Sequence, residues 1–310
     1  MDYNAFVEEQ VSYIQKEVGS GVAINALSGG VDSSVVTALG HRALGDRLKT
    51  VFIDSALMRE GEPQGVVKAF ADMGIPVRVV DARTDFLRAL KGLTDPEEKR
   101  NAVTKTFYST VFGRLVRETG AKFLLHGTIL TDIEETVAGI KRQHNILSQL
   151  GIDPEKEYGY KVLEPLKTLR KDGVREVAKV LGMKPEITQR IPFPGPALAT
   201  RVVGEVTEER LAVVRAATTI VEEELKDTGA FQYLAVLLND RATGIVEGKR
   251  EFGQIIVVRC LHSVDARTAT SVDLPWEKLH RICKRITAIK GVNRCLYDIT
   301  PKPPATIEYI

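Results

Sequence analysis

The sequence predicts an α/β protein: a parallel sheet with helices on both faces, followed by a smaller C-terminal α+β domain. In the first half of the 310 residues, short β-rich runs alternate with helical patterns. That alternation is typical of βαβ units with right-handed crossovers. The proline-rich stretch Pro192–Pro196 then interrupts the pattern, and the elements after it follow a different order. We therefore expect two domains, residues 1–190 and 191–310.

Four buried parallel strands are expected in the first domain, at Gly21–Leu27, Leu48–Asp54, Val77–Asp81 and Lys122–Gly127. Helices should connect them, over Val31–Leu44, around Glu62–Met73, and from a cap at Asp95 to Gly120. In such sheets ligands bind beyond the carboxyl ends of the strands. One edge of the sheet should therefore carry Ser28–Ser34, Asp54–Arg59 and Gly127–Glu135.

The second domain should begin with a long helix, Thr207–Lys226. Its other expected elements are strands near Phe231–Leu238 and Gln254–Leu261, a helix from Pro275 to about Lys290, and a strand at Asn293–Ile299. This sheet is open, so a partner could pair with it.

The composition narrows the class of protein. The formal net charge of +2 gives no argument for a nucleic-acid binder. Three scattered cysteines suit a reducing compartment, and we expect them to be small buried hydrophobic residues. The histidines lack zinc-site spacing. No apolar run has the length of a membrane helix and no leader pattern is visible, so a cytoplasmic protein is expected.

The stretch "ALSGGVDSSVV", Ala26–Val36, places two glycines, several hydroxyls and one carboxylate between a strand and a helix. Backbone N–H groups at such a junction form an anion site. Asp32 would repel a phosphate unless a divalent cation lay between them, so the arrangement predicts Mg²⁺ with phosphate. A simple helix cap would need only one such residue. The stretch is neither a Walker A loop nor a GxGxxG motif.

The stretch resembles the SGGxDS signature of the PP-loop ATP pyrophosphatases. Longer segments narrow the resemblance to the synthetase portion of GMP synthetase: "FIDSALMR", "HGTILTDIEET", "VLEPLKTLRKDGVREVAKVLG", "PFPGPALATRVVGEV" and "YDITPKPPATIEYI". The resemblance covers about Gly21 to Ile310. It implies an adenine nucleotide alpha hydrolase-like fold and the ligase reaction XMP + ATP + NH₃ → GMP + AMP + PPi, a step of purine biosynthesis.

The resemblance also implies roles for particular residues. Asp32 would be catalytic and the Mg²⁺ ligand, with Asp132 as a further candidate ligand, and Lys171 would be a catalytic second phosphate contact. The backbone of Ile53 would receive adenine. XMP would be held by Arg59, Lys302, Thr306 and Glu308. The pyrophosphate would be held by Ser28, Gly29, Gly30, Val31, Asp32, Ser33 and Ser34.

Partners follow from the same resemblance. Ammonia would come from a separate glutamine amidotransferase subunit, because only about twenty residues precede the first strand. A homodimer through the C-terminal domain is implied, with neither nucleic acid nor membrane as a partner. Glu135 could assist the metal or the substrate. Lys141, His144 and Asn145 would belong to a lid that substrate orders.

The chain departs from the family pattern at several positions. Thr131 stands where proline is usual, Gly173 where glutamate is usual, and Ala197 where glycine is usual. "KRQHNILSQLG" replaces a segment with one more histidine and two more glycines, and "EGKR", Glu247–Arg250, replaces a "GDxR" turn. The expected lid and the second-domain turn therefore depart from the pattern, whereas the phosphate loop and the C-terminal tail keep it.

Two other interpretations remain open. One is a different PP-loop enzyme, such as NAD synthetase, a tRNA thiolase or lysidine synthetase. A tRNA enzyme would favour a basic stripe and catalytic cysteines, which this composition does not supply. The other is a nucleotide-binding regulatory subunit that has lost catalysis, although the intact phosphate loop and Lys171 argue against it.

Overall fold

The computed structural model describes residues 1–137, 159–188, 191–264 and 266–310, and the chain divides into two compact units. The first unit contains Met1–Asp54, Glu62–Ala82 and Thr104–Arg190. The second contains Ser55–Gly61, Arg83–Val103 and Ile191–Ile310. Two short stretches of the N-terminal half thus pack with the C-terminal residues. The single boundary at 190/191 stays a prediction.

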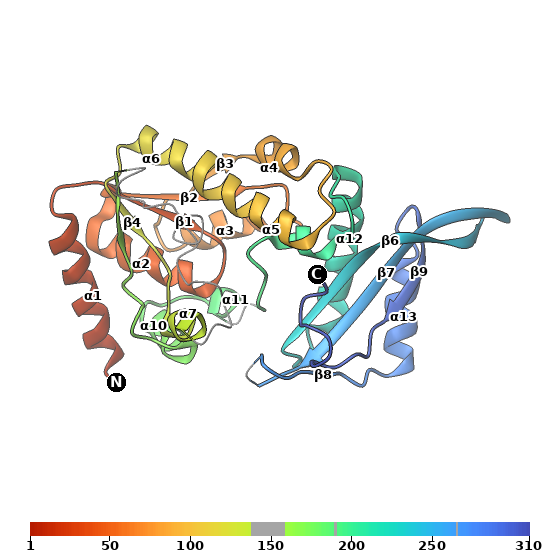
Figure 1. The fold of residues 1–310 in the computed structure, drawn as a ribbon. Coiled ribbons are helices and arrows are strands. Elements are labelled where there is room, and N and C mark those ends of the chain that lie inside the picture. The colour runs from red at the N-terminus through yellow and green to blue at the C-terminus, as the bar shows by residue number, and fades with distance from the viewer. Residues whose placement is uncertain (138–158, 189–190, 265) are drawn as a thin grey trace. The chain divides into compact units, whose positions relative to one another are not determined.

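The first unit is built on a five-stranded parallel sheet in the order β3-β2-β1-β4-β5, drawn in Figure 1. Its strands are β1 (Ala23–Leu27), β2 (Leu48–Asp54), β3 (Arg78–Asp81), β4 (Phe123–Leu125) and β5 (Lys161–Leu163). The parallel sheet and its four expected strands are confirmed. We did not predict β5, since its three residues are too few to show a periodic pattern.

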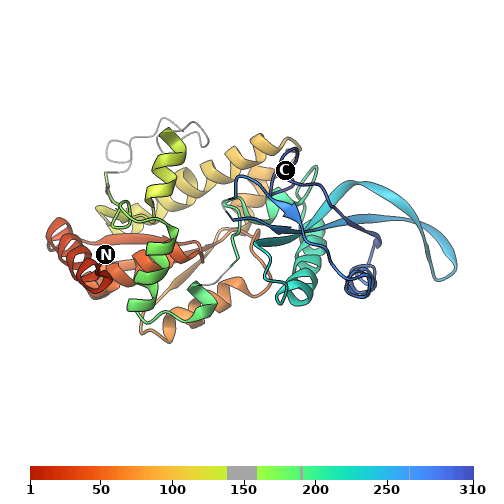
Figure 2. The ribbon, with the colours of Figure 1, turned by 90° about the horizontal axis from the view of Figure 1, so that it is seen from below.

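The strand order reverses beside β1, because β2 and β3 lie on one side of it and β4 and β5 on the other. Right-handed crossovers then place the connecting helices on opposite faces. One face carries α1 (Tyr3–Val18), α2 (Val31–Leu44) and α10 (Lys171–Val180), which pack together, with α11 (Pro185–Thr188) against α2 and α10. Figure 2 shows the sheet with helices on both of its faces.

The segment between β3 and β4 ends in η2 (Thr106–Phe112) and α6 (Gly113–Thr119), and η2 is a π-helix. The sequence predicts one continuous helix from Pro96 to Gly120. The structure confirms a helical path there and adds the wider turn in its middle. The remaining elements of this unit are η1 (Gly45–Arg47), α3 (Glu62–Ala71) and α7 (Leu130–Val137).

The second unit contains a four-stranded sheet of β6 (Gln232–Val246), β7 (Lys249–His262), β8 (Thr270–Ser271) and β9 (Val292–Tyr297). Leu234, Val236 and Val257 form a buried cluster in it. The helices η3 (Ala197–Arg201) and α12 (Glu208–Leu225) pack against β6, and α13 (Trp276–Ile286) packs against β9 and α12. The unit also contains α4 (Arg83–Leu90) and most of α5 (Pro96–Lys105). The expected C-terminal α+β arrangement is confirmed.

The β6–β7 hairpin is longer than predicted. Apolar alternation in the sequence stops near Leu238 and resumes near Gln254, yet Arg241–Val246 pairs with Lys249–Gln254. Backbone pairing continues there although most of those side chains are exposed. Within the described ranges, we find no helix with the length and apolar character needed to span a membrane.

Candidate active site

The phosphate loop, Ser28–Ser34, joins β1 to α2 at the carboxyl edge of the first unit's sheet. Gly29 has a φ of 76°, in the left-handed region where a side chain is strained. Gly30 is the N-cap residue of α2 and offers no side chain for capping. The first N–H groups of α2 have no intrahelical acceptors, so they remain available to an anion.

Hydroxyl groups hold the loop in shape. The Ser33 hydroxyl donates to the carbonyl of Gly30 at 3.0 Å and accepts from the Ser28 N–H at 3.2 Å. Its oxygen lies 3.0 Å from the Ser28 hydroxyl, and the Ser34 hydroxyl donates to the same Gly30 carbonyl at 2.9 Å. The predicted phosphate residues are therefore brought together in one preorganised turn. Val31 contributes a buried side chain under it.

Asp32 and Lys171 meet beside this loop, although 139 positions separate them. The Lys171 ammonium lies 2.5 Å from Oδ2 of Asp32. Oδ1 of Asp32 is buried and makes no hydrogen bond to any residue within the described ranges. An orphaned carboxylate oxygen fits a hard cation, so Asp32 could hold Mg²⁺.

Asp132 plays a visible local role. Its Oδ2 accepts a hydrogen bond from the N–H of Ile129 at 3.1 Å, at the start of α7. In the described part of the chain no three His, Cys, Asp or Glu residues form a metal-binding group. Mg²⁺ commonly needs only one or two carboxylates when substrate phosphates supply the other ligands. The assignment of Asp132 to the metal stays a prediction.

Gly127, the second residue after β4, packs against the phosphate loop. A Cβ atom at this position would lie 3.2 Å from both the carbonyl carbon of Asp32 and the N of Ser33. The sequence predicts Gly127 at this edge of the sheet but indicates no role for it. The lack of a side chain here lets β4 approach the loop closely.

His126 and Thr128 flank that glycine and form a chain of polar contacts. The Thr128 hydroxyl donates to Glu164 at 2.6 Å, so it accepts from Nδ1 of His126 at 2.8 Å. Because the hydroxyl has a single proton and donates it to Glu164, the proton in the contact with His126 belongs to Nδ1. No local sequence pattern indicates these contacts, because Glu164 lies 36 residues from Thr128.

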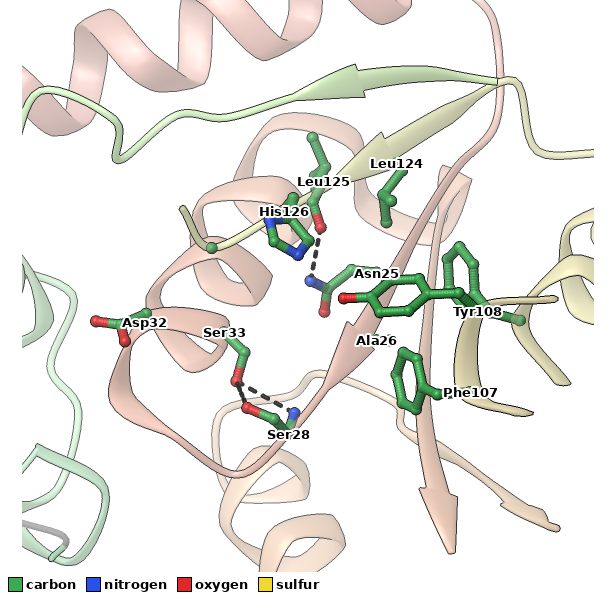
Figure 3. Close-up of a pocket in the computed structure, with 12 residues that line it drawn as sticks. Asn25, Ala26, Ser28, Asp32, Ser33, Phe107, Tyr108, Leu124, Leu125 and His126 are labelled. Carbon is green, nitrogen blue, oxygen red and sulfur yellow. Dashed lines mark hydrogen bonds between the residues drawn. The ribbon is translucent and has the colours of Figure 1, made fainter. Parts of the chain in front are cut away.

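A pocket of about 240 Å³ opens beside the phosphate loop (Figure 3). It lies between β1 and β4, where the strand order reverses, which is the usual ligand position in an open α/β sheet. Ile53 is buried at the end of β2 and does not line this pocket. Its backbone contact with adenine stays a prediction.

Arg59 lies in the second unit, on the loop Ser55–Gly61. Its guanidinium donates to Glu222 of α12 at 3.1 Å and lies 4.4 Å from the ring centre of Phe193. Arg215, also on α12, donates to the carbonyls of Ala56 and Met58 at 2.5 and 2.9 Å. These contacts hold the backbone of the loop that carries Arg59.

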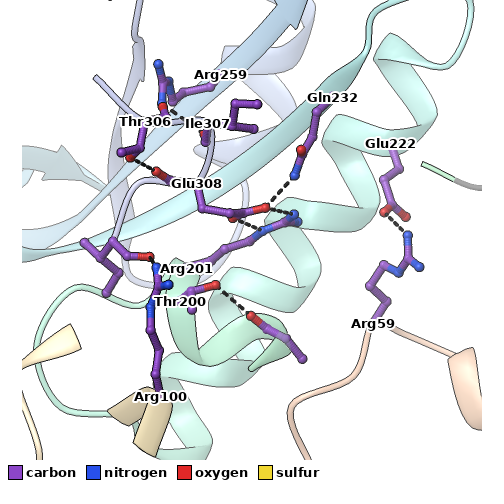
Figure 4. Close-up of polar contacts among 12 residues, drawn as sticks. Arg59, Arg100, Thr200, Arg201, Glu222, Gln232, Arg259, Thr306, Ile307 and Glu308 are labelled. Carbon is purple, nitrogen blue, oxygen red and sulfur yellow. Dashed lines mark hydrogen bonds and ion pairs between the residues drawn. The ribbon is translucent and has the colours of Figure 1, made fainter. Parts of the chain in front are cut away.

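Glu308 occupies a socket of buried donors (Figure 4). Arg201 donates to both of its carboxylate oxygens, at 3.2 and 3.1 Å, and Gln232 donates to Oε1. The Arg201 guanidinium also lies over Phe193, at 4.7 Å. The predicted substrate residues Arg59 and Glu308 therefore share one network, joined through Phe193 and Arg201.

The C-terminal tail is ordered by Arg259 of β7, whose side chain is only 1% exposed. Arg259 donates to the carbonyls of Thr300, Thr306 and Ile307 and pairs with Asp298 at 2.9 Å. The Thr306 hydroxyl donates to the carbonyl of Glu308. A single arginine in a strand gives no sequence signal for such a role, so Arg259 was not predicted.

Lys302 stands apart from that socket. Its ammonium donates to the carbonyl of Ala266 at 2.7 Å, and its backbone pairs with Ala269. The structure thus places Lys302 against the loop before β8. The expected lid residues Lys141, His144 and Asn145 lie outside the described residues, and the side chain of Glu135 is not described.

Comparisons with known proteins find family matches in the N-terminal and in the C-terminal part of the chain. A family model described as NAD synthase matches residues 2–111, and one described as GMP synthase C terminal domain matches residues 218–309. A subunit of glutamine-hydrolyzing GMP synthase from Archaeoglobus fulgidus is 50% identical over 310 residues, covering 100% of both chains. The chain belongs to this family of GMP synthase subunits.

Other members of the family show the same extent of similarity. The corresponding GMP synthase subunit from Pyrococcus horikoshii is 48% identical over 313 residues and covers 100% of both chains. The one from Methanocaldococcus jannaschii is 48% identical over 314 residues and covers 99% of both. An NH₃-dependent NAD synthetase from Campylobacter jejuni has a TM-score of 0.49 at 17% identity, covering 61% of this chain and 77% of that one.

Two of the departures from the family pattern have a local explanation. Gly173 is buried in α10, and a Cβ there would lie 3.3 Å from the side chain of Leu169 and 3.7 Å from that of Tyr3, so a larger side chain would crowd these neighbours. At the hairpin tip, Glu247 and Gly248 both have positive φ, as a two-residue type I′ turn requires.

Ala197 has a φ of 53°, a conformation that favours the glycine usual in the family.

The prediction that all three cysteines are buried is wrong for two of them. Cys260 is buried, but Cys283 and Cys295 are half-buried between α13 and β9. Burial raises the pKa of Cys260 to about 11 and that of Cys295 to about 12. These two thiols therefore stay protonated near neutral pH and are poor nucleophiles.

Proposed function

We propose that this chain is the synthetase component of a two-subunit GMP synthase. It would adenylate XMP with ATP, release pyrophosphate, and let ammonia displace AMP to form GMP. The observation that carries the proposal is the phosphate loop at the N-terminus of α2, with the orphaned Oδ1 of Asp32 and the ammonium of Lys171 beside it.

Each of these groups has a chemical task in the proposal. The first N–H groups of α2 and the loop hydroxyls would hold the β- and γ-phosphates as they leave. Lys171 would exchange its contact with Asp32 for a phosphate oxygen. Mg²⁺, when bound with ATP at Asp32, would neutralise charge on the leaving pyrophosphate. The neighbouring pocket between β1 and β4 would take part of the nucleoside.

The second unit would hold XMP. Arg59 and Lys302 supply cations for its phosphate, and Glu308 and Thr306 lie in the same tail as Lys302. Glu308 already accepts three hydrogen bonds from Arg201 and Gln232. We therefore assign Glu308 mainly to ordering the tail, with at most one remaining acceptor position for substrate.

The alternative functions are less well supported. The NAD synthase model covers only residues 2–111, a region that PP-loop enzymes share, whereas the C-terminal match is to GMP synthase. A purely regulatory subunit would have no need of the Asp32–Lys171 pair. Ammonia from a separate glutamine amidotransferase subunit, a homodimer through the second unit, and a cytoplasmic location are further parts of the proposal.

A single-turnover assay tests the proposal. Purified chain, Mg²⁺ and labelled ATP should release pyrophosphate when XMP is added, and ammonium salts should convert the XMP to GMP. Glutamine should not replace ammonium for the isolated chain. Pyrophosphate release that depends on nicotinate adenine dinucleotide or tRNA instead of XMP would favour another PP-loop enzyme, and no release would favour the regulatory interpretation.

A further inference from the structure

The pocket beside the phosphate loop has one wall that the strands do not provide. Its first wall consists of Asn25 and Ala26 of β1 with Leu124 and Leu125 of β4. The opposite wall consists of Phe107, Tyr108 and Phe112, all from the π-helix η2. At about 240 Å³ the pocket is smaller than sites for whole ligands, so it suits a part such as a flat base.

The π-helical turn determines which side chains face the pocket. Its i→i+5 hydrogen bonding brings residues five apart to the same face, which an ordinary α-helix does not do. Phe107 and Phe112 are five apart, and their rings are stacked with an interplanar angle of 4° and centres 6.3 Å apart. Tyr108 lies edge-on to Phe107, at 4.9 Å. Such turns occur frequently at functional sites.

Most polar groups lining the pocket are already hydrogen-bonded. The Asn25 amide donates to the carbonyl of Leu125 at 3.1 Å and accepts from Thr37. Ser28 and Ser33 bond each other. The Tyr108 hydroxyl is different: within the described ranges it makes no hydrogen bond, and Figure 3 shows it directed into the pocket toward β1 and β4.

The Tyr108 hydroxyl is also fixed in its protonated form. Burial raises its pKa to about 12, so it is a neutral O–H donor across the physiological range. A ligand that fills the pocket would displace water from this hydroxyl, and a donor buried without a new partner is costly. A ligand that enters the pocket should therefore present an acceptor to it.

We propose that Tyr108 is a specificity-determining residue whose hydroxyl donates a hydrogen bond to a ring nitrogen of the adenine of ATP. The inference rests on the proposed use of ATP. The phosphates lie at Ser28–Ser34, at one edge of the pocket, and the aromatic wall at Phe107 supplies a flat apolar surface for the base. Adenine offers N1, N3 and N7 as ring acceptors, and all three are unprotonated at neutral pH.

The test is calorimetric titration, without XMP, of Mg²⁺-ATP and of its 1-deaza, 3-deaza and 7-deaza analogues. Each analogue replaces one ring nitrogen by carbon and so removes one acceptor. For the native chain, one analogue should bind roughly three- to tenfold more weakly than ATP, the range of one neutral hydrogen bond. Tyr108→Phe should weaken ATP by the same factor and should no longer distinguish that analogue from ATP.

Two results would overturn the inference: equal affinities of native chain and Tyr108→Phe for ATP, or a Tyr108→Phe loss that is the same for ATP and every analogue. Tyr13→Phe, a half-exposed tyrosine of α1 away from the pocket, is the matched control and should change nothing. Unchanged pyrophosphate affinity and unfolding midpoint show that Tyr108→Phe is folded. Because XMP is absent, this outcome is independent of XMP-dependent turnover.

Discussion

The ammonium of Lys171 lies 2.5 Å from the carboxylate of Asp32, and the two residues come from different helices, α10 and α2. The pair is partly exposed, at 45% and 26%, so it contributes little to stability. Its position beside the phosphate loop gives it another use. The lysine compensates the carboxylate that would otherwise repel an incoming phosphate.

Replacing Asp32 by asparagine should therefore affect chemistry more than folding. We expect Asp32→Asn to slow XMP-dependent pyrophosphate release by roughly a hundredfold or more, because a metal ligand and its charge are lost. Stopped-flow pyrophosphate detection measures this at saturating Mg²⁺. Asp46→Asn, at an exposed acidic residue of η1, is the control. A rate within twofold of the native chain would remove Asp32 from the metal site.

Gly127→Ala should displace the backbone of the phosphate loop. The new Cβ would lie 3.2 Å from backbone atoms of Asp32 and Ser33, which cannot rotate away. We expect pyrophosphate affinity to fall roughly tenfold, about 1.4 kcal/mol. Isothermal titration with Mg²⁺-pyrophosphate measures it. Gly65→Ala, in α3 with open space around its Cβ, should leave affinity unchanged and slightly stabilise the helix. Equal affinities for both variants would mean that the loop does not depend on Gly127.

Ala197→Gly should stabilise the chain or leave its stability unchanged. A left-handed φ costs a non-glycine residue about 1–2 kcal/mol, whereas glycine costs about 0.5–1 kcal/mol of extra backbone entropy. Urea denaturation would show a midpoint equal to or above that of the native chain. Ala199→Gly, in the same turn without a positive φ, should lower the midpoint instead. A clear loss of stability in Ala197→Gly would refute the strain argument.

Lys99 should make stability depend on alkaline pH. Its ammonium is buried and donates to the carbonyls of Val202, Gly204 and Ala199 at 2.7, 3.1 and 3.4 Å. Burial, and then the charge of Arg210, lower its pKa to about 8, while Asp95 opposes the shift. Between pH 8 and the ordinary lysine pKa the unfolded chain binds more protons, so the free energy of unfolding should rise with pH there.

The full effect is on the order of 3 kcal/mol. Urea denaturation at about pH 7.5, 8.5 and 9.5 would show the rise. Lys99→Met should flatten it, and Lys105→Met, at an exposed lysine of the same helix, should retain it. An identical slope in all three proteins would exclude Lys99 as its source.

Substitutions of Glu308 and Lys302, the two charged residues near the C-terminus, should have different effects on stability and on XMP binding. Glu308→Gln leaves the charge of buried Arg201 uncompensated, and we expect a loss of about 3 kcal/mol in the free energy of unfolding. Lys302→Ala removes one bond to the carbonyl of Ala266 and should cost less than about 1 kcal/mol, yet weaken XMP binding roughly tenfold to a hundredfold. Denaturation and XMP titration of both variants distinguish these roles. Unchanged XMP affinity in Lys302→Ala would leave the tail purely structural.

The sequence by itself determined what depends on neighbours along the chain. The alternation of apolar runs with helical patterns is local, so it predicted the strands Leu48–Asp54 and Val77–Asp81 and the helix Val31–Leu44. The loop Ser28–Ser34 is contiguous, so its glycines and hydroxyls predicted a phosphate site before any fold was known. The resemblance to GMP synthetase, carried by contiguous motifs, is borne out by a relative of 50% identity.

Only the tertiary structure decided contacts between distant residues and local departures from regular backbone. Lys171 could be read from the sequence as a solvated helix residue until the fold set it against Asp32. The hydrogen bonds that Arg201 and Gln232 donate to Glu308 were visible only in the fold, and the assignment of Glu308 to XMP stays a prediction. The π-helix that carries Tyr108 leaves no periodic pattern in the sequence. It adds one residue to a helical turn, which reorients the side chains without changing the amino-acid composition. Burial and long-range pairing select these arrangements, and neither is a property of a short segment.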